Sequence, residues 1–291
     1  MSIEMNSTCI ACRVDRITAK VSTLGTEAQT TAFLKEWMKL AITYSPDVDS
    51  ARCGYYTDNL IKEFYGVDPA ESHIQDRRDS NQFVLERIDL IRNRIKSADD
   101  PLYAGLQYAI LGNYLDFAAL AGRVSYEEMD ALLDKYKDFV LDKQVVADFA
   151  SDLEKAENLL ILTDNAGEIV FDRVLAELIQ ELYPDLKITF CVRGLPVAND
   201  ATREDALAAQ ITFPVLDNGT ALGGTDLETL PPETRQAFET ADVILAKGMG
   251  NTESLFGCGY NVYYAFMVKC KRFEEFFGAD FMQALFLRDK K

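Results

Sequence analysis

The feature that most constrains this fold is a series of short apolar runs in the second half of the chain. The runs span residues 159–162, 188–192, 211–216 and 243–246, and a further run at 263–268 has the same character. Stretches with helical periodicity separate them, the clearest of which extends from Phe171 to Leu182. Short strands that alternate with helices are typical of crossover units in a mostly parallel sheet. We therefore predict an α/β domain over residues 151–291.

The first half of the chain has a different pattern. Its apolar residues keep the spacing of amphipathic helices throughout residues 1–150, with breaks at Gly25, Pro46, Gly66 and Pro101. Glycine and proline at such positions are typical helix ends. The sequence therefore predicts a helical N-terminal part before the α/β domain.

One of these predicted helices, residues 102–120, carries polar residues on its apolar face. Asn113 interrupts the apolar stripe between Ile110 and Phe117, and Asp116 lies three residues further on. A buried asparagine has to be hydrogen-bonded. Two interpretations stay open: Asn113 ties two helices together, or it faces a ligand.

Polar residues and glycines follow each of the first four apolar runs. They are Asp164-Asn165, Arg193-Gly194 with Asn199-Asp200, Asp217-Asn218-Gly219, and Lys247-Gly248 with Gly250-Asn251. In open α/β sheets, ligands bind beyond the carboxyl ends of the strands. Four consecutive strands that all end in such residues are hard to explain by chance, so we expect these side chains to form one site.

The segment after the first run is compatible with two kinds of ligand. Asp164 and Asn165 stand at the end of the predicted strand, and a turn through Gly167 leads into a helix. Fixed oxygen atoms suit hard cations, whereas free N–H groups at a helix start suit phosphates. The alternative is that Asp164 or Asn165 only caps the helix, since both residue types are favoured N-caps. The segment by itself does not decide between these readings.

Composition excludes several classes of protein. The 291 residues carry a net charge of −17, which argues against a nucleic-acid partner because such binding relies on Lys and Arg contacts to phosphate. The chain has no apolar run long enough for a membrane span and no apolar signal segment near its N-terminus. We therefore expect a cytoplasmic protein without a membrane partner.

The histidine and cysteine content narrows the chemistry. His73 is the only histidine, which excludes a zinc site with several histidine ligands, and we expect it at the surface without a catalytic role. Cys9 and Cys12 form a CxxC pair, but no second pair follows at the spacing that zinc sites need. We interpret these two as buried packing residues, as free cysteines often are.

Several motifs, taken together, resemble the signature blocks of the damage-control phosphatases, metal-dependent enzymes also known as domain of unknown function 89. The motifs are TDNAGE at 163–168, ANDAT at 198–202, KGMGNTE at 247–253, and Asp100-Pro101 followed by GNYLD at 112–116. The CxxC pair also resembles a cysteine pair in the prokaryotic branch of the family. This resemblance covers nearly the whole chain. One departure is Met249, where the family more often has glutamine, which leaves the substrate preference open.

The resemblance implies both a fold and a set of site residues. The fold is a helical N-terminal part packed on a three-layer α/β/α sandwich with a Rossmann-like, mostly parallel sheet. The implied metal ligands are Asp164, Asn165 and Asp200. The implied substrate-side residues are Asn113, Asp116 and Lys247. The resemblance therefore favours the ligand-facing interpretation of Asn113 and the metal-ligand interpretation of Asp164.

The expected activity is hydrolysis of phosphate monoesters of small metabolites, either sugar phosphates or damaged phosphometabolites. Oxygen ligands suit Mg²⁺ or Mn²⁺, with Co²⁺ or Ni²⁺ as further candidates. Asp164 and Asp200 would hold the metal for catalysis, and Lys247 would neutralise phosphate oxygens as a point charge. The N–H groups around Gly167 and Glu168 would donate further hydrogen bonds to the phosphate.

Three alternatives belong to other classes. A haloacid dehalogenase-type phosphatase needs a second Asp two residues after the first, but position 166 is Ala. A nucleotide-dependent methyltransferase or dehydrogenase needs more glycines after the first strand than Gly167 alone. A non-catalytic protein that binds sugar phosphates or nucleotides would keep the same pocket, and this alternative stays open. The sequence does not determine the oligomeric state.

Overall fold

A six-stranded, mostly parallel sheet forms the centre of the computed structural model, which describes residues 3–43, 48–113, 131, 133–134 and 136–289. The strands are β1 (Asn158–Leu162), β2 (Lys187–Val192), β3 (Val215–Asp217), β4 (Val243–Lys247), β5 (Val262–Met267) and β6 (Ala284–Arg288). Their order is β3-β2-β1-β4-β5-β6, and every neighbouring pair is parallel except β5 with β6. The predicted crossover connections are therefore present.

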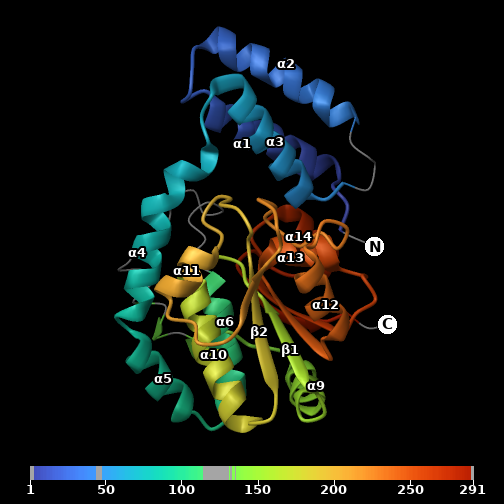
Figure 1. Ribbon diagram of the computed structural model, residues 1–291. Helices are drawn as coiled ribbons and strands as arrows, with labels where there is room; N and C mark the ends of the chain where they lie inside the picture. Colours follow the sequence, from blue (N-terminus) through green and yellow to red (C-terminus); the bar gives the residue numbers. More distant parts are fainter. Residues whose placement is uncertain (1–2, 44–47, 114–130, 132, 135, 290–291) are drawn as a thin grey trace.

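Helices cover both faces of this sheet (Figure 1). Side chains of a strand alternate between the faces, so Leu159 and Ile161 of β1 join one core while Leu160 and Leu162 join the other. The helices in the first core are α6 (Pro101–Gly112), α9 (Lys143–Leu153) and α10 (Glu168–Leu182). Those in the second are α12 (Pro232–Thr240), α13 (Gly248–Leu255) and α14 (Lys271–Phe277). This three-layer α/β/α sandwich confirms the predicted fold class.

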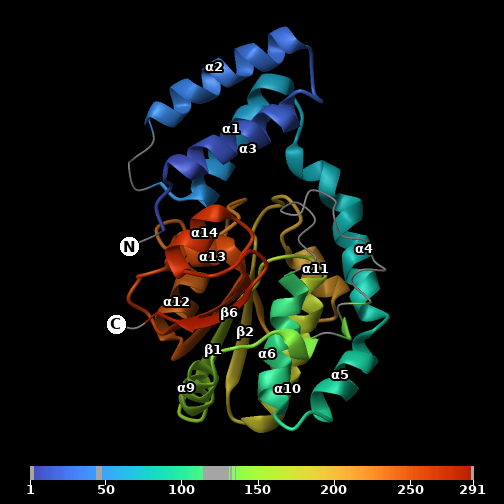
Figure 2. The same ribbon diagram turned by 180° about the vertical axis from the view of Figure 1, so that it is seen from behind.

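The N-terminal helices form two groups (Figure 2). The first group is α1 (Ser7–Val21), α2 (Glu27–Thr43) and α3 (Ser50–Tyr65); the second is η1 (Pro69–His73), α4 (Ile74–Leu85) and α5 (Ile88–Lys96). Helices α1–α3 enclose a core of their own, in which the Trp37 indole donates a hydrogen bond to Thr57 Oγ1 at 2.9 Å. They lie above the sandwich, where α1 contacts α14 and α3 contacts α13. Helices α4 and α5 run along its side and pack on α10.

Helix packing also bears on the predicted division at residue 150. Helix α6 precedes this position and α9 crosses it, yet both contribute side chains to the first of the two cores, the one that contains Leu159 and Ile161. Helix α6 packs along the length of α10, with Gly105 and Gly112 allowing the close approach of Leu175 and Phe171. The boundary at 150 stays a prediction.

Several element limits differ from the prediction. The run at 211–216 yields only the short strand β3, which starts after Pro214, a residue without an N–H for the ladder. Helix α10 starts at Glu168 rather than near Phe171. Strand β6 was not predicted. The short elements η3 (Tyr136–Asp138) and α11 (Arg203–Ala208) lie in stretches that were predicted to be helical, η3 in a helix expected to extend toward Phe139. Residues 114–120 of the predicted helix 102–120, with Asp116, lie outside the described residues.

Within the part of the chain that the structure describes, no helix combines the length and the apolar character that crossing a bilayer requires.

Candidate functional site

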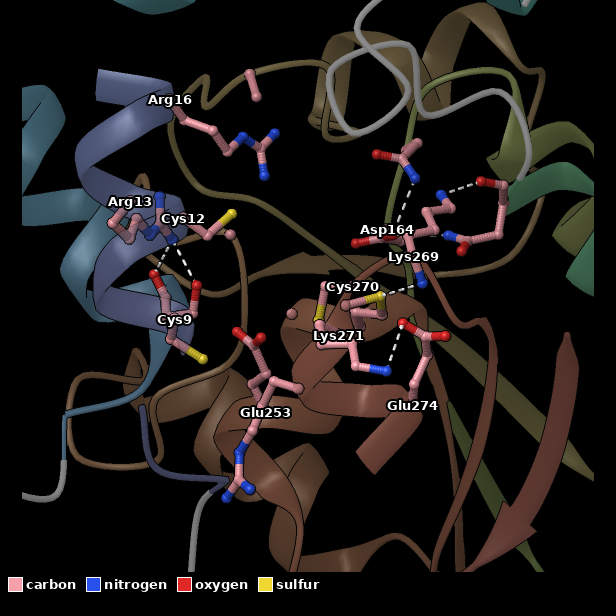
Figure 3. A pocket seen from close by; sticks show the side chains of 18 of the residues that line it. Cys9, Cys12, Arg13, Arg16, Asp164, Glu253, Lys269, Cys270, Lys271 and Glu274 are labelled. Carbon is pink, nitrogen blue, oxygen red and sulfur yellow. Dashed lines mark hydrogen bonds and ion pairs between the residues drawn. The ribbon is translucent and has the colours of Figure 1, made fainter. Parts of the chain in front are cut away.

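A cavity of about 670 Å³ opens at the carboxyl edge of the sheet. One wall is formed by α1, and the other by the segments that follow β1, β2, β4 and β5 (Figure 3). The polar residues predicted for the site whose side chains line this cavity are Asn113, Asp164, Asn165, Asn199 and Asp200. The structure therefore brings together five residues that the sequence places on three separate segments.

Asp164 and Asp200 meet around a buried arginine. Nε of Arg193 donates to Asp200 Oδ2 at 2.6 Å, and its Nη2 donates to Asp164 Oδ1 at 3.4 Å. Only 1% of Arg193 is exposed, whereas 8% of each aspartate is, so the carboxylates have an open side towards the cavity. Burial alone would lower the pKa of the Arg193 guanidinium. The two neighbouring carboxylates have the larger combined effect, so the pKa lies above its usual value. The arginine is therefore a permanent cation that fixes both acids.

The backbone fixes the same two loops. The Ala201 N–H donates to the Asp164 carbonyl at 2.7 Å, and the Ala166 N–H donates to the Asn199 carbonyl at 2.9 Å. An isolated β-bridge also joins Asn165 to Asp200. The positions of Asp164 and Asp200 therefore depend on direct pairing between the loops after β1 and β2.

Two asparagine amides orient Asp164 from the other side. Nδ2 of Asn113 donates to Asp164 Oδ2 and to Glu168 Oε2, both at 2.9 Å. Nδ2 of Asn165 donates to the same two oxygens at 2.9 and 3.0 Å. Oδ1 of Asn113 accepts from the Met267 N–H at 3.3 Å. Asn113 thus connects α6 to α10 and β5 and also lines the cavity, so both interpretations of this residue describe part of its surroundings.

The start of α10 decides the helix-cap alternative. The N-cap residue is Gly167, which has φ of 75° and no side chain with which to cap. The Asn165 side chain donates to carboxylates, as described above, instead of accepting from the helix N–H groups. The Gly167 N–H itself donates to Asn81 Oδ1 at 2.7 Å. The prediction that this N–H faces a phosphate is therefore wrong in this structure, because Asn81 already accepts from it.

Lys247 lies behind the cavity wall and not in it. Its Nζ donates to Glu168 Oε1 at 2.6 Å, to Asp172 Oδ1 at 2.7 Å and to the Ala109 carbonyl at 2.8 Å. These contacts use all three N–H groups of the ammonium, and both Lys247 and Glu168 are fully buried. The structure thus does not bring Lys247 or Glu168 into contact with a ligand in the cavity, which corrects the predicted phosphate contact.

This buried cluster has shifted pKa values. Burial alone would lower the pKa of Lys247, but Asp172 and Glu168 raise it above the usual lysine value. Burial raises the pKa of Asp172 to about 7, against the opposing effect of Lys247. Two carboxyl groups thus share one permanently charged ammonium. The cluster also reaches the site, since Glu168 accepts from Asn113 and Asn165.

The cysteine pair is placed differently from the prediction. Cys12 is exposed, Cys9 is partly buried, and both line the cavity from α1. The interpretation of the pair as buried packing residues is therefore wrong, because α1 turns this face towards the cavity and away from its own helical core. Nδ1 of His73 lies 3.4 Å from Asp76 Oδ2, and His73 is not among the residues that line this cavity.

Asn251, which follows the fourth run, accepts from Arg193 Nη1 at 3.1 Å, and its Nδ2 donates to the Thr163 carbonyl at 3.0 Å. Two other residues near the site, Lys269 and Asp172, were not identified from the sequence. Lys269 lines the cavity and donates to the Asn113 carbonyl. Asp172 lies on the apolar face of α10, where a carboxylate requires a cation. The interruption of the apolar stripe by Asp172 could have indicated a buried cation nearby. No pattern in the sequence indicated Lys269 as a site residue.

The chain is an α/β protein whose candidate site lies beyond the carboxyl ends of its strands, where ligands bind in open sheets of this kind. The chain belongs to the damage-control phosphatase family: the model of the damage-control phosphatase ARMT1-like domain matches residues 5–284. This confirms the resemblance recognised in the motifs. The family assignment supports a phosphatase.

Similar proteins include two archaeal relatives. A damage-control phosphatase of Archaeoglobus fulgidus is 33% identical over 224 residues, which cover 74% of each chain. A damage-control phosphatase of Pyrococcus horikoshii is 29% identical over 266 residues, covering 90% of this chain and 89% of that one. A crystal structure of a domain-of-unknown-function-89 protein from Pyrococcus horikoshii has a TM-score of 0.83 and 24% identity, with 99% of both chains covered. At that identity the likeness bears on the fold alone.

Proposed function

We propose that this chain is a metal-dependent phosphatase that hydrolyses phosphate monoesters of small metabolites, such as sugar phosphates or damaged phosphometabolites. The observation that carries the proposal is the pairing of Asp164 with Asp200 around Arg193, with both carboxylates open to the cavity. Family membership supports the phosphatase activity; the metal and the substrate class are our inference from the site.

The donor set fits a hard divalent cation. Two carboxylates and the amide oxygen of Asn165 supply oxygen atoms only, which suits Mg²⁺ or Mn²⁺, with Co²⁺ or Ni²⁺ as further candidates. Among the described residues no group of three or more His, Cys, Asp or Glu is arranged for a metal. The proposed site does not belong to that type of group, because its donors are two carboxylates and one asparagine amide. Because Nδ2 of Asn165 faces Asp164 and Glu168, its Oδ1 is the atom available for a cation.

The other residues of the site would position these ligands and the phosphate. When bound, the cation would polarise the phosphoryl group and activate a water molecule for attack. Arg193 and Asn113 would hold the two carboxylates in place. Lys269, which extends into the same end of the cavity as Asp164 (Figure 3), would neutralise phosphate oxygens in the role first expected of Lys247.

Hydrolysis of p-nitrophenyl phosphate tests this proposal. We expect phosphate release with Mg²⁺, Mn²⁺, Co²⁺ or Ni²⁺ and none in the presence of a chelator. A panel of phosphorylated sugars would then rank the substrates. Binding of sugar phosphates or nucleotides without any metal-dependent release would instead support the non-catalytic alternative.

Gly248 provides a test of the geometry. Its φ is 76°, and a Cβ at this position would lie 2.0 Å from Asp164 Oδ2. Gly248→Ala should displace the carboxylate and lower turnover by about a hundredfold, since misplacement by ~1 Å can have this effect. It should also cost about 1–3 kcal/mol of stability through backbone strain.

Gly66→Ala is the matched control for this variant. Its φ is 67°, but a Cβ there would meet nothing within 4 Å. This substitution should lower the melting temperature while turnover is retained. Equal turnover in the two folded variants would show that Gly248 does not set the position of Asp164.

A further inference from the structure

The cavity continues from the oxygen ligands to a second wall that is strongly basic. Five cationic side chains line the cavity: Arg13 and Arg16 from α1, Lys269 from the segment after β5, and Lys271 and Arg272 from the start of α14. Its acidic side chains are Asp164, Asp200, Glu253 and Glu274. The two aspartates are assigned to the proposed cation and Lys269 to the phosphate to be cleaved. The remaining four cations, Arg13, Arg16, Lys271 and Arg272, form the basic wall and face two acids. This local excess is notable in a chain with a net charge of −17.

The acids on the basic wall do not cancel that excess. Burial raises the pKa of the Glu253 carboxyl to about 8, although Arg13 opposes the change. Glu274 approaches Lys271 at 3.9 Å. The wall therefore keeps most of its positive charge towards the cavity.

The cations of the wall differ in how they are placed. Arg13 donates to Ser50 Oγ at 2.7 Å, and Arg272 donates to the Glu4 carbonyl at 3.3 Å. Both therefore also connect parts of the chain to one another. Arg16 is an exposed side chain on α1 that extends from this helix into the cavity, across from Asp164 (Figure 3). Its guanidinium can bind a carboxylate or a phosphate through two parallel hydrogen bonds.

We propose that this basic wall, with Arg16 as its central contact, selects phosphorylated metabolites that carry a second anionic group, a phosphate or a carboxylate, at the end remote from the phosphate to be cleaved. This inference rests on the proposed function, because the cleaved phosphate is placed at Asp164 and Asp200. The cavity volume of about 670 Å³ agrees with such a substrate. Sites for whole small molecules have volumes of roughly 300–1,000 Å³, so a single phosphate group would leave much of this one unfilled.

Two matched pairs of ligands test the proposal by calorimetry. Glucose 1,6-bisphosphate differs from glucose 6-phosphate by a second phosphate. Likewise, 6-phosphogluconate differs from glucitol 6-phosphate by a carboxylate in place of an alcohol. We expect the doubly anionic member of at least one pair to bind at least about tenfold more tightly, the effect of one charge-assisted contact. A preference in the first pair alone identifies a phosphate site, and one in both pairs identifies a site that also accepts carboxylates.

Substitutions assign the preference to the wall. In Arg16→Gln the ratio of the two dissociation constants should fall close to one, and Arg16→Lys should restore part of it. Arg78→Gln removes the same charge from an exposed position on α4 that is not a cavity residue, and the ratio should stay as in the unmodified protein. The double variant Arg16→Gln, Lys271→Gln should abolish the preference if the first change leaves any.

The outcomes separate this inference from the proposed function. A ratio close to one in the unmodified protein, or an unchanged ratio in the double variant, would overturn the basic wall as a selective site. Metal-dependent release from p-nitrophenyl phosphate would be unaffected by that result. Conversely, a binding preference that depends on Arg16 in a protein without phosphatase activity would refute the proposed function and leave the second anion site standing.

Discussion

Replacing Asp164 or Asp200 by alanine should lower kcat/KM by at least about a hundredfold, equivalent to about 2.7 kcal/mol of transition-state stabilisation. Each carboxylate is proposed to supply part of one cation site, so either loss leaves the site incomplete. The double variant should lose little more activity than the single ones, because residues that act as a unit are not additive. Turnover measured over a range of Mg²⁺ concentrations checks both expectations.

The effect of these substitutions on stability should differ from their effect on activity, because the double variant should be much less stable than either single variant. A single substitution leaves Arg193 paired with the remaining aspartate, whereas the double substitution leaves a guanidinium that is 1% exposed without either acid. Removing the partner of a buried charge typically costs about 3–5 kcal/mol. The double variant should therefore unfold at a much lower temperature than the single ones. Normal metal-dependent turnover in a folded Asp164→Ala protein would remove the basis of the site assignment.

Lys247→Met should be the most destabilising single substitution among those considered, with a loss of about 3–5 kcal/mol at neutral pH. Glu168 and Asp172 would remain buried without the ammonium that now lies within 2.7 Å of both. Urea unfolding should show this loss as a lower midpoint. Lys187→Met is the control, since this lysine is exposed on β2 and its replacement should change stability little.

The loss in Lys247→Met should depend on pH. Burial already raises the pKa of Asp172 from 3.8 to about 7, and without Lys247, which lowers it, this pKa should rise further. A group whose pKa is raised in the folded state binds more protons there than in the unfolded chain, so stability falls as pH rises from about 4 through the folded-state pKa. The variant should thus recover part of its stability at pH 5.5 relative to pH 7.5. A constant difference from the unmodified protein across this range would contradict the burial of these carboxylates.

The sequence was most informative where position along a strand determines position in space. Asp164 and Asp200 follow different apolar runs, and parallel strands bring the ends of such runs to one edge, so their proximity could be predicted before any contact was known. The same reasoning placed Lys247 at that edge correctly. It did not give the direction of its side chain, because a residue at the end of a strand can face a cavity or the interior.

Other parts of the site depend on packing that no local pattern encodes. Arg16 belongs to a helix with its own small core, and only the docking of α1 on α14 brings it to the cavity. For the same reason Cys9 and Cys12, which have ordinary helical spacing, could not be assigned to a cavity wall. Asp172 was more accessible to prediction, since an acid within the apolar stripe of α10 requires a buried cation.

The strand order has a consequence for how this site could change in evolution. From β1 the chain passes through α10 on one face to β2, and from β4 it passes through α13 on the other face to β5. The loops after these two adjacent strands therefore diverge and leave a crevice at a topological switch point. This crevice is a property of the connectivity, so it would survive replacement of every ligand within it. A descendant of this chain that lost both aspartates would keep a groove at the same place, in which other side chains could bind a different ligand.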